Sequence, residues 1–240
     1  MRPKATDPFN NRPEDVLNKA IRAGVGALPV VGSPLLEFLA FVIGDPAQER
    51  RDDFMKETVD RVMSLESKFK ALRPDALREN EQFQATFIQS ARIATTTASA
   101  AKKKLLQNAI LNSAIISVSE TIRQIFMQNL DRITPQHAVR LNFVDKPAGN
   151  PAAAASAKGM MMGSLTSIIE KALPEMYSNK EIFDRICVDL YSMGLTTNES
   201  FGGMQSGSGL LDRRTTNLGQ SFLAFISDPE TSQIPPDDHS

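Results

Sequence analysis

The chain has 240 residues, of which 41% are hydrophobic, and its formal net charge is −1. This near-neutral balance excludes the strong basic excess of a dedicated nucleic-acid-binding domain, and a single cysteine excludes an intramolecular disulfide. The first residues, MRPKATDPFNNRPEDVL, place proline and aspartate where a signal peptide needs an apolar core. We therefore expect a cytoplasmic protein with one large or two smaller helical domains.

The most hydrophobic stretch is LPVVGSPLLEFLAFVI, residues 28–43. It is shorter than the roughly 20 apolar residues that a membrane-spanning helix needs, and Pro34 and Glu37 interrupt it. A buried pair of helices is the first interpretation, and a membrane-inserting segment is the second. The side chains expected to form a membrane or oligomer surface here are Val31, Leu35, Leu36, Phe38, Leu39, Phe41 and Val42.

Helical periodicity dominates the chain up to residue 130. Apolar residues recur every three or four positions over 46–72, again from Asn80 onward, and in a wide stripe over 105–130. We predict an antiparallel helical bundle for residues 1–130, with the stripe at its centre. Asn108 and Asn112 fall within the stripe and are expected to make buried hydrogen bonds, whereas the lysine run 102–104 is expected to be a solvated face.

The second half changes composition. Residues 145–164, DKPAGNPAAAASAKGMMMGS, suggest a long low-complexity loop, and helices are expected at 165–176 and 180–193. A glycine- and serine-rich stretch, residues 194–219, then leads into a short apolar helix. Residues 229–240 carry three acids and no lysine or arginine, which predicts a disordered acidic tail.

Two motifs in this half resemble the winged helix-turn-helix superfamily. YSMGL, residues 191–195, is similar to the end of that fold's third helix, where a Gly-Leu pair starts the wing. RRTTNLGQSFLAFI, residues 213–226, is similar to the returning strand and its following helix, and ITPQHAVRLNFV, residues 133–144, to the first helix. The resemblance implies a mainly α fold class: a helical bundle, then a winged-helix-like module with a small β hairpin over 131–228. The alanine-rich insertion departs from the compact family pattern.

The resemblance also implies which residues would contact a partner. Winged helices commonly place the third helix in the major groove of DNA, and the basic residues in matching positions are Lys180 and Arg185 on that helix and Arg213 and Arg214 beside the wing. Three acids on the same helix outnumber its bases and would repel phosphates. A protein partner is therefore preferred to DNA.

No pattern predicts an enzyme. The two histidines, His137 and His239, have no cluster of metal-binding or nucleophilic residues beside them, and His137 is expected to be a helix cap or a surface residue. No P-loop, Gly-x-Ser-x-Gly or His-Glu-x-x-His motif occurs. We predict no catalytic residue, metal, cofactor or small-molecule substrate.

The prediction is thus a non-enzymatic protein-interaction or regulatory adaptor that binds a protein partner or a second copy of itself. Two alternatives stay open. One is a membrane-active helical effector, of the defence or cell-death type, that inserts residues 28–43. The other is a DNA-binding transcriptional regulator.

Overall fold

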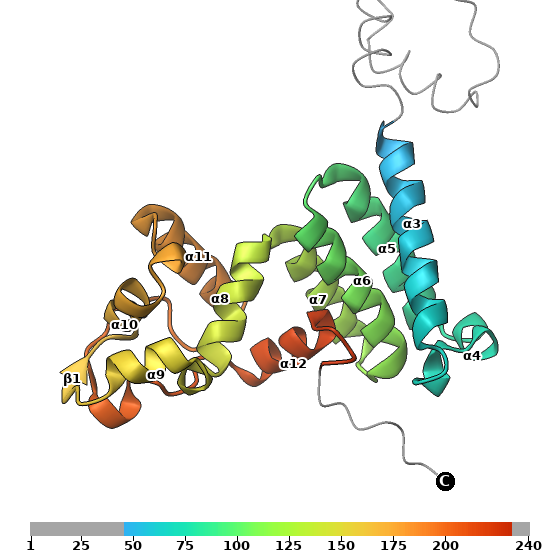
Figure 1. Cartoon of the computed structure of the whole chain (residues 1–240). Coiled ribbons are helices and arrows are strands. Elements are labelled where there is room, and N and C mark those ends of the chain that lie inside the picture. Colours follow the sequence, from blue (N-terminus) through green and yellow to red (C-terminus); the bar gives the residue numbers. More distant parts are fainter. Residues whose placement is uncertain (1–45, 232–240) are drawn as a thin grey trace, which may run out of the picture. The chain divides into compact units, whose positions relative to one another are not determined.

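The computed structural model describes residues 46–231, with side chains from Glu49 onward (Figure 1). The apolar segment 28–43, with the proposed membrane or oligomer surface from Val31 to Val42, lies outside these residues, as do residues 232–240 of the predicted tail. The described part is mainly helical, as predicted. Within it, no helix combines the length and the hydrophobicity needed to cross a membrane.

The first half consists of helices joined by short turns. They are α3 (Pro46–Leu65), the 3-10 helix η2 (Lys70–Leu72), α4 (Pro74–Arg78), α5 (Glu81–Thr96), α6 (Ala100–Ile115) and α7 (Glu120–Arg132). Side-chain oxygens of Asn80, Ser99 and Ser119 cap the first turns of α5, α6 and α7. The helical stripe predicted over 105–130 is therefore not continuous: α6 ends at Ile115, and Ser119 caps the start of a new helix.

The second half alternates helices with very short strands. Its elements are α8 (Pro135–Asp145), η3 (Pro147–Gly149), α9 (Pro151–Ala157), β1 (Met162–Gly163), α10 (Leu165–Ala172), η4 (Pro174–Met176), α11 (Lys180–Ser192), β2 (Gln205–Ser206), η5 (Gly207–Gly209) and α12 (Asn217–Ile226). The loop expected over 145–164 contains a helix instead. Asn150 caps α9 with two hydrogen bonds, and the buried side chain of Ala153 attaches that helix to the core.

Two antiparallel pairings organise the stretch around the glycine- and serine-rich segment. β1 pairs with β2 in the register Met162↔Ser206 and Gly163↔Gln205, and an isolated bridge joins Thr196 to Thr215. Gly207 lies so close to β1 that a Cβ there would be 2.1 Å from the carbonyl oxygen of Met160. The absence of a side chain at this position is what allows the two segments to approach.

The larger hydrophobic core of the described residues runs from Phe54 on α3 to Ile226 on α12, and a smaller one contains Val62, Leu65, Leu72 and Leu111. Residues 47–231 belong to one compact unit. α12 packs against α6 and α8 (Figure 1). Its Phe222 and Phe225 rings lie 5.5 and 5.2 Å from the ring of Phe126 on α7. The predicted boundary near residue 130 thus falls inside this unit, because the last helix completes the core of the earlier ones.

Candidate functional site

Helix α6 is buried on all sides between Leu106 and Ser113, yet it carries several polar side chains. Asn112 Nδ2 donates hydrogen bonds to the carbonyls of Ala224, Phe225 and Ser227, at 3.0, 2.9 and 2.8 Å. Asn108 Nδ2 donates to the carbonyl of Ile226 at 2.8 Å. The two buried asparagines predicted from the sequence are thus confirmed, and together they satisfy the C-terminal carbonyls of α12.

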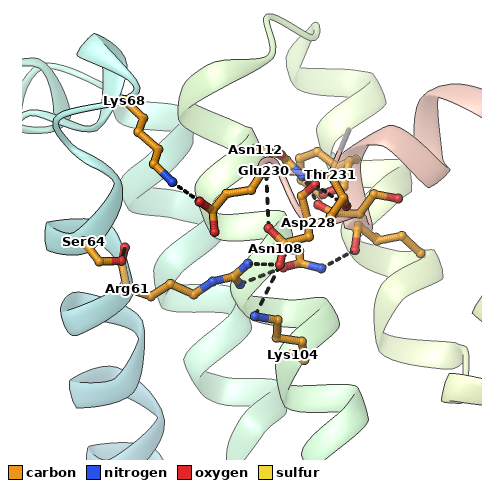
Figure 2. Close-up of polar contacts among 12 residues, drawn as sticks. Arg61, Ser64, Lys68, Lys104, Asn108, Asn112, Asp228, Glu230 and Thr231 are labelled. Carbon is orange, nitrogen blue, oxygen red and sulfur yellow. Dashed lines mark hydrogen bonds and ion pairs between the residues drawn. The ribbon is translucent and has the colours of Figure 1, made fainter. Parts of the chain in front are cut away.

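A polar cluster adjoins this cap, where residues 227–231 leave α12 (Figure 2). Arg61 on α3 donates through Nη1 to Asn108 Oδ1 at 2.7 Å, and its Nη2 lies 2.8 Å from Asp228 Oδ2. Lys104 Nζ on α6 lies 3.5 Å from the same carboxylate oxygen, and Lys68 forms an ion pair with Glu230. We name Arg61, Lys68 and Lys104 the basic surface, and residues 227–231 the acidic segment.

The electrostatics of this cluster favour a charged Asp228. Partial burial by itself raises the pKa of this carboxyl group. A hydrogen bond from the backbone N–H of Glu230 and the charges of Arg61 and Lys104 outweigh burial, so that the pKa of Asp228 lies below its usual value. The carboxylate therefore holds α3, α6 and the acidic segment together at neutral pH. No local sequence pattern reveals this cluster, because Arg61 and Asp228 are far apart in the chain.

Lys102 contradicts the predicted solvated lysine face. Its side chain is only 5% exposed, and its ammonium group donates to the carbonyls of Leu130, Asp131 and Ile133 at the C-terminal end of α7. A lysine in this position compensates the negative end of the helix dipole and satisfies the free carbonyls. Burial lowers the pKa of Lys102 to about 8, and the charge of Asp131 opposes part of this effect.

The lowered pKa of Lys102 predicts a pH dependence of stability. The pKa of Lys102 is about 8 in the folded protein and has its ordinary value of 10.5 in the unfolded chain. At a pH between these two values, Lys102 is protonated in the unfolded chain and deprotonated in the folded protein. Stability must then rise with pH, by up to about 1.4 kcal/mol per pH unit from this group. Only the wild type contains this group. We therefore expect the unfolding free energy of wild type minus that of Lys102→Met, measured by denaturant titration, to become more positive from pH 8 to pH 10. A constant difference would contradict the prediction.

The two basic residues predicted on the third helix are paired within that helix. Lys180 forms an ion pair with Asp184, and Arg185 Nε donates to Asp189 Oδ2 at 3.0 Å. Burial raises the pKa of Asp189, but the hydrogen bonds and charges of Arg185 and His137 outweigh it and leave the pKa lowered. On the outer face of α11, each basic side chain therefore forms an ion pair with one acidic side chain of the same helix.

Arg213 and Arg214 are also engaged inside the chain. Arg213 donates to the carbonyl oxygen of Asp145 at 3.1 Å and to Gln220 Oε1 at 2.9 Å. Arg214 is 7% exposed and donates to Gln205 Oε1 and to the carbonyl of Gly209, at 2.8 and 2.7 Å. The Arg214 side chain thus joins positions within the glycine- and serine-rich stretch, and its backbone N–H attaches that stretch to α8 by donating to the carbonyl of Val144 at 2.9 Å. In the described part of the chain, no ion pair or hydrogen bond joins these two arginines to the α11 pairs.

His137 lines an open pocket of about 540 Å³ between α8 and α11. Its Nδ1 accepts the backbone N–H of Thr134 at 3.1 Å, which makes it a helix cap, and its Nε2 lies 3.6 Å from Asp189 Oδ2. The imidazole is buried, and burial lowers its pKa despite the opposing charge of Asp189. Since the cap occupies Nδ1, the ring has no free basic nitrogen for a substrate in this arrangement.

Several apolar side chains remain exposed on α11. Tyr191 is 47% exposed, and Val188, three residues earlier, lies on the same side of the helix. Ile182 is also exposed, at 51%, because it faces the pocket beside His137 and not the core. This face of α11 therefore combines exposed aliphatic and aromatic groups with paired charges.

Comparison with known proteins identifies no family: the chain matches no protein-family model, no curated protein and no solved structure.

Proposed function

We propose that this protein is a non-enzymatic interaction or regulatory adaptor, and that its second half is a winged-helix-like module that binds a protein partner through the outer face of α11. The order of elements supports the resemblance. It runs α8, η3, α9, β1, α10, η4 and α11, in which α9 belongs to the alanine-rich insertion, and the antiparallel bridge between Thr196 and Thr215 follows. In the resemblance, α11 is the third helix and residues 194–216 are the wing.

The pairing of charges on α11 is the observation that carries the proposal. Lys180 and Arg185 are bound to Asp184 and Asp189 one turn away, so contact with a DNA phosphate would have to break an ion pair. Glu181 adds a negative charge to the same helix. A surface of this kind repels a polyanion but accepts a protein, whose own charges and apolar groups can match it. Val188 and Tyr191 supply the apolar part of such a contact.

Site-specific photo-crosslinking tests this proposal. A benzophenone amino acid at position 188 or 191 should give the same crosslinked product in cells, since both side chains lie on one side of α11. Ile88 on α5 is the matched control, because it is apolar and more exposed than either residue but lies outside the proposed module. Equal labelling from all three positions would contradict a contact centred on α11. A product of twice the chain mass would identify the partner as a second copy.

DNA binding is tested separately by mobility shift with mixed-sequence duplexes at low salt. We expect no shift. A salt-dependent shift that Lys180→Glu or Arg185→Glu abolishes would overturn the protein-partner proposal in favour of a DNA-binding regulator. Arg214 is unsuitable for this test, because its buried hydrogen bonds make any loss of binding ambiguous.

A further inference from the structure

The acidic segment supplies the carboxylates of the ion pairs that the basic surface makes among the described residues, while Arg61 also donates to Asn108. Arg61 and Lys104 reach the carboxylate of Asp228, and Lys68 reaches that of Glu230 (Figure 2). The three cations come from two places far apart in the sequence, α3 with its following turn and the first turns of α6. Folding therefore brings three positive charges together, and the carboxylates of Asp228 and Glu230 from the same chain bind to them.

The acidic segment is not needed to complete helix α12. Asn108 and Asn112 already satisfy the carbonyls of residues 224–227, which precede Asp228. The segment S-D-P-E-T also contributes little to the core, since Pro229 is its only apolar side chain, although that ring is buried. Ion pairs thus join Asp228 and Glu230 to α3, its following turn and α6, and Lys68, Lys104 and Glu230 are each substantially exposed.

We infer that the basic surface is a binding site for an acidic peptide of a partner protein, and that Asp228 and Glu230 occupy it as an internal competitor. The occupant is defined by charge complementarity: two carboxylates two residues apart, facing Arg61, Lys104 and Lys68. The Lys68–Glu230 and Lys104–Asp228 pairs are exposed on the lysine side and screened by salt. The less exposed Arg61–Asp228 pair is the contact that a competing carboxylate has to replace, and none of these pairs is part of α12. This inference is independent of the α11 contact, because it uses other helices.

The competition has a direct consequence for affinity. A segment joined to its site by a few residues acts at an effective concentration in the millimolar range, so a free peptide competes poorly with it. Removing the two internal carboxylates should open the site to a peptide in solution. The probe is a fluorescent synthetic peptide with the sequence of residues 227–240, SDPETSQIPPDDHS, and the readout is its anisotropy.

The comparison uses full-length protein. We expect the double variant Asp228→Asn, Glu230→Gln to bind the peptide at least 10-fold more tightly than wild type does, and a further Arg61→Glu substitution to abolish the gain. Lys103→Glu is the matched charge control, because Lys103 neighbours Lys104 on α6 but has no ion pair among the described residues. Raising the salt concentration should weaken binding. Equal affinity for wild type and the double variant, or binding unaffected by Arg61→Glu, would overturn the inference.

Hydrogen exchange on wild-type protein tests release without any substitution. The amide of Thr231 donates to the carbonyl of Asp228, and that of Glu230 donates to the Asp228 carboxylate. We expect both amides to exchange at least 10-fold faster at high than at low salt, whereas the amide of Gly219, which donates to the capping side chain of Thr216 at the other end of α12, keeps its rate. Salt-independent exchange at Glu230 and Thr231 would show that the acidic segment is a fixed part of the fold and would contradict a releasable competitor.

Discussion

Replacing Gly219 with alanine is expected to lower the free energy of unfolding by about 3 kcal/mol, because the new methyl group has no space. A Cβ at this position would lie 2.1 Å from the carbonyl oxygen of Leu195 and 3.0 Å from its carbonyl carbon. Both atoms belong to the backbone, and the same oxygen accepts the N–H of Thr216 at 3.1 Å. Relief of the clash would therefore have to move α12 away from the end of α11 and disturb the core beneath it.

The matched control for this substitution is Gly203→Ala. Nothing lies within 4 Å of a Cβ at Gly203, and its φ is not in the left-handed region. Alanine there should change stability by less than about 0.5 kcal/mol, as exposed substitutions usually do. Both variants are measured by urea unfolding followed by circular dichroism. A Gly219→Ala protein as stable as Gly203→Ala would show that α12 is not closely packed on Leu195.

Replacing Asn112 with leucine should also be strongly destabilising, by about 2–4 kcal/mol, since it removes the donor for three carbonyls at the end of α12. Leucine has as many side-chain heavy atoms as asparagine and is larger, so it leaves no cavity, and the effect of its extra volume is measured separately at a second buried asparagine. The cost is large because Asn112 is fully buried and water cannot replace its amide group. The same unfolding assay measures the change.

Asn129→Leu provides the comparison. Asn129 on α7 is also buried, but its Nδ2 has no hydrogen-bond partner in the described structure. The leucine variant at this position should be as stable as wild type or more stable, because it removes a buried polar atom that makes no hydrogen bond. If both substitutions lowered the free energy of unfolding by similar amounts, the cause would be the shape of leucine in the interior. The hydrogen bonds of Asn112 to the end of α12 would then contribute little to stability.

The helical character and many helix starts follow from local sequence. Asn80 and the pair Thr134-Pro135 cap helices where the pattern predicted, since a side chain that bonds to the first-turn amides acts within a few residues. The buried asparagines of α6 were also predictable, because polar residues inside an apolar stripe need partners. The same local pattern failed over residues 116–119 and over 151–157, where capping by Ser119 and Asn150 decides the structure.

The candidate sites depend on contacts between distant parts of the chain, which composition and periodicity do not encode. The sequence predicted Lys102 as solvated and Arg214 as a partner contact, yet tertiary packing buries both against backbone carbonyls. The Arg61–Asp228 pair was also not predictable from the sequence, since the pair exists only after α12 has packed on α6. By itself the sequence therefore determined a mainly helical chain with most of its caps. Only the tertiary structure decided which charged side chains are bound within the chain and which remain available to a partner. The reason is that a charged group interacts with the polar groups closest to it in space, and these often come from distant parts of the sequence.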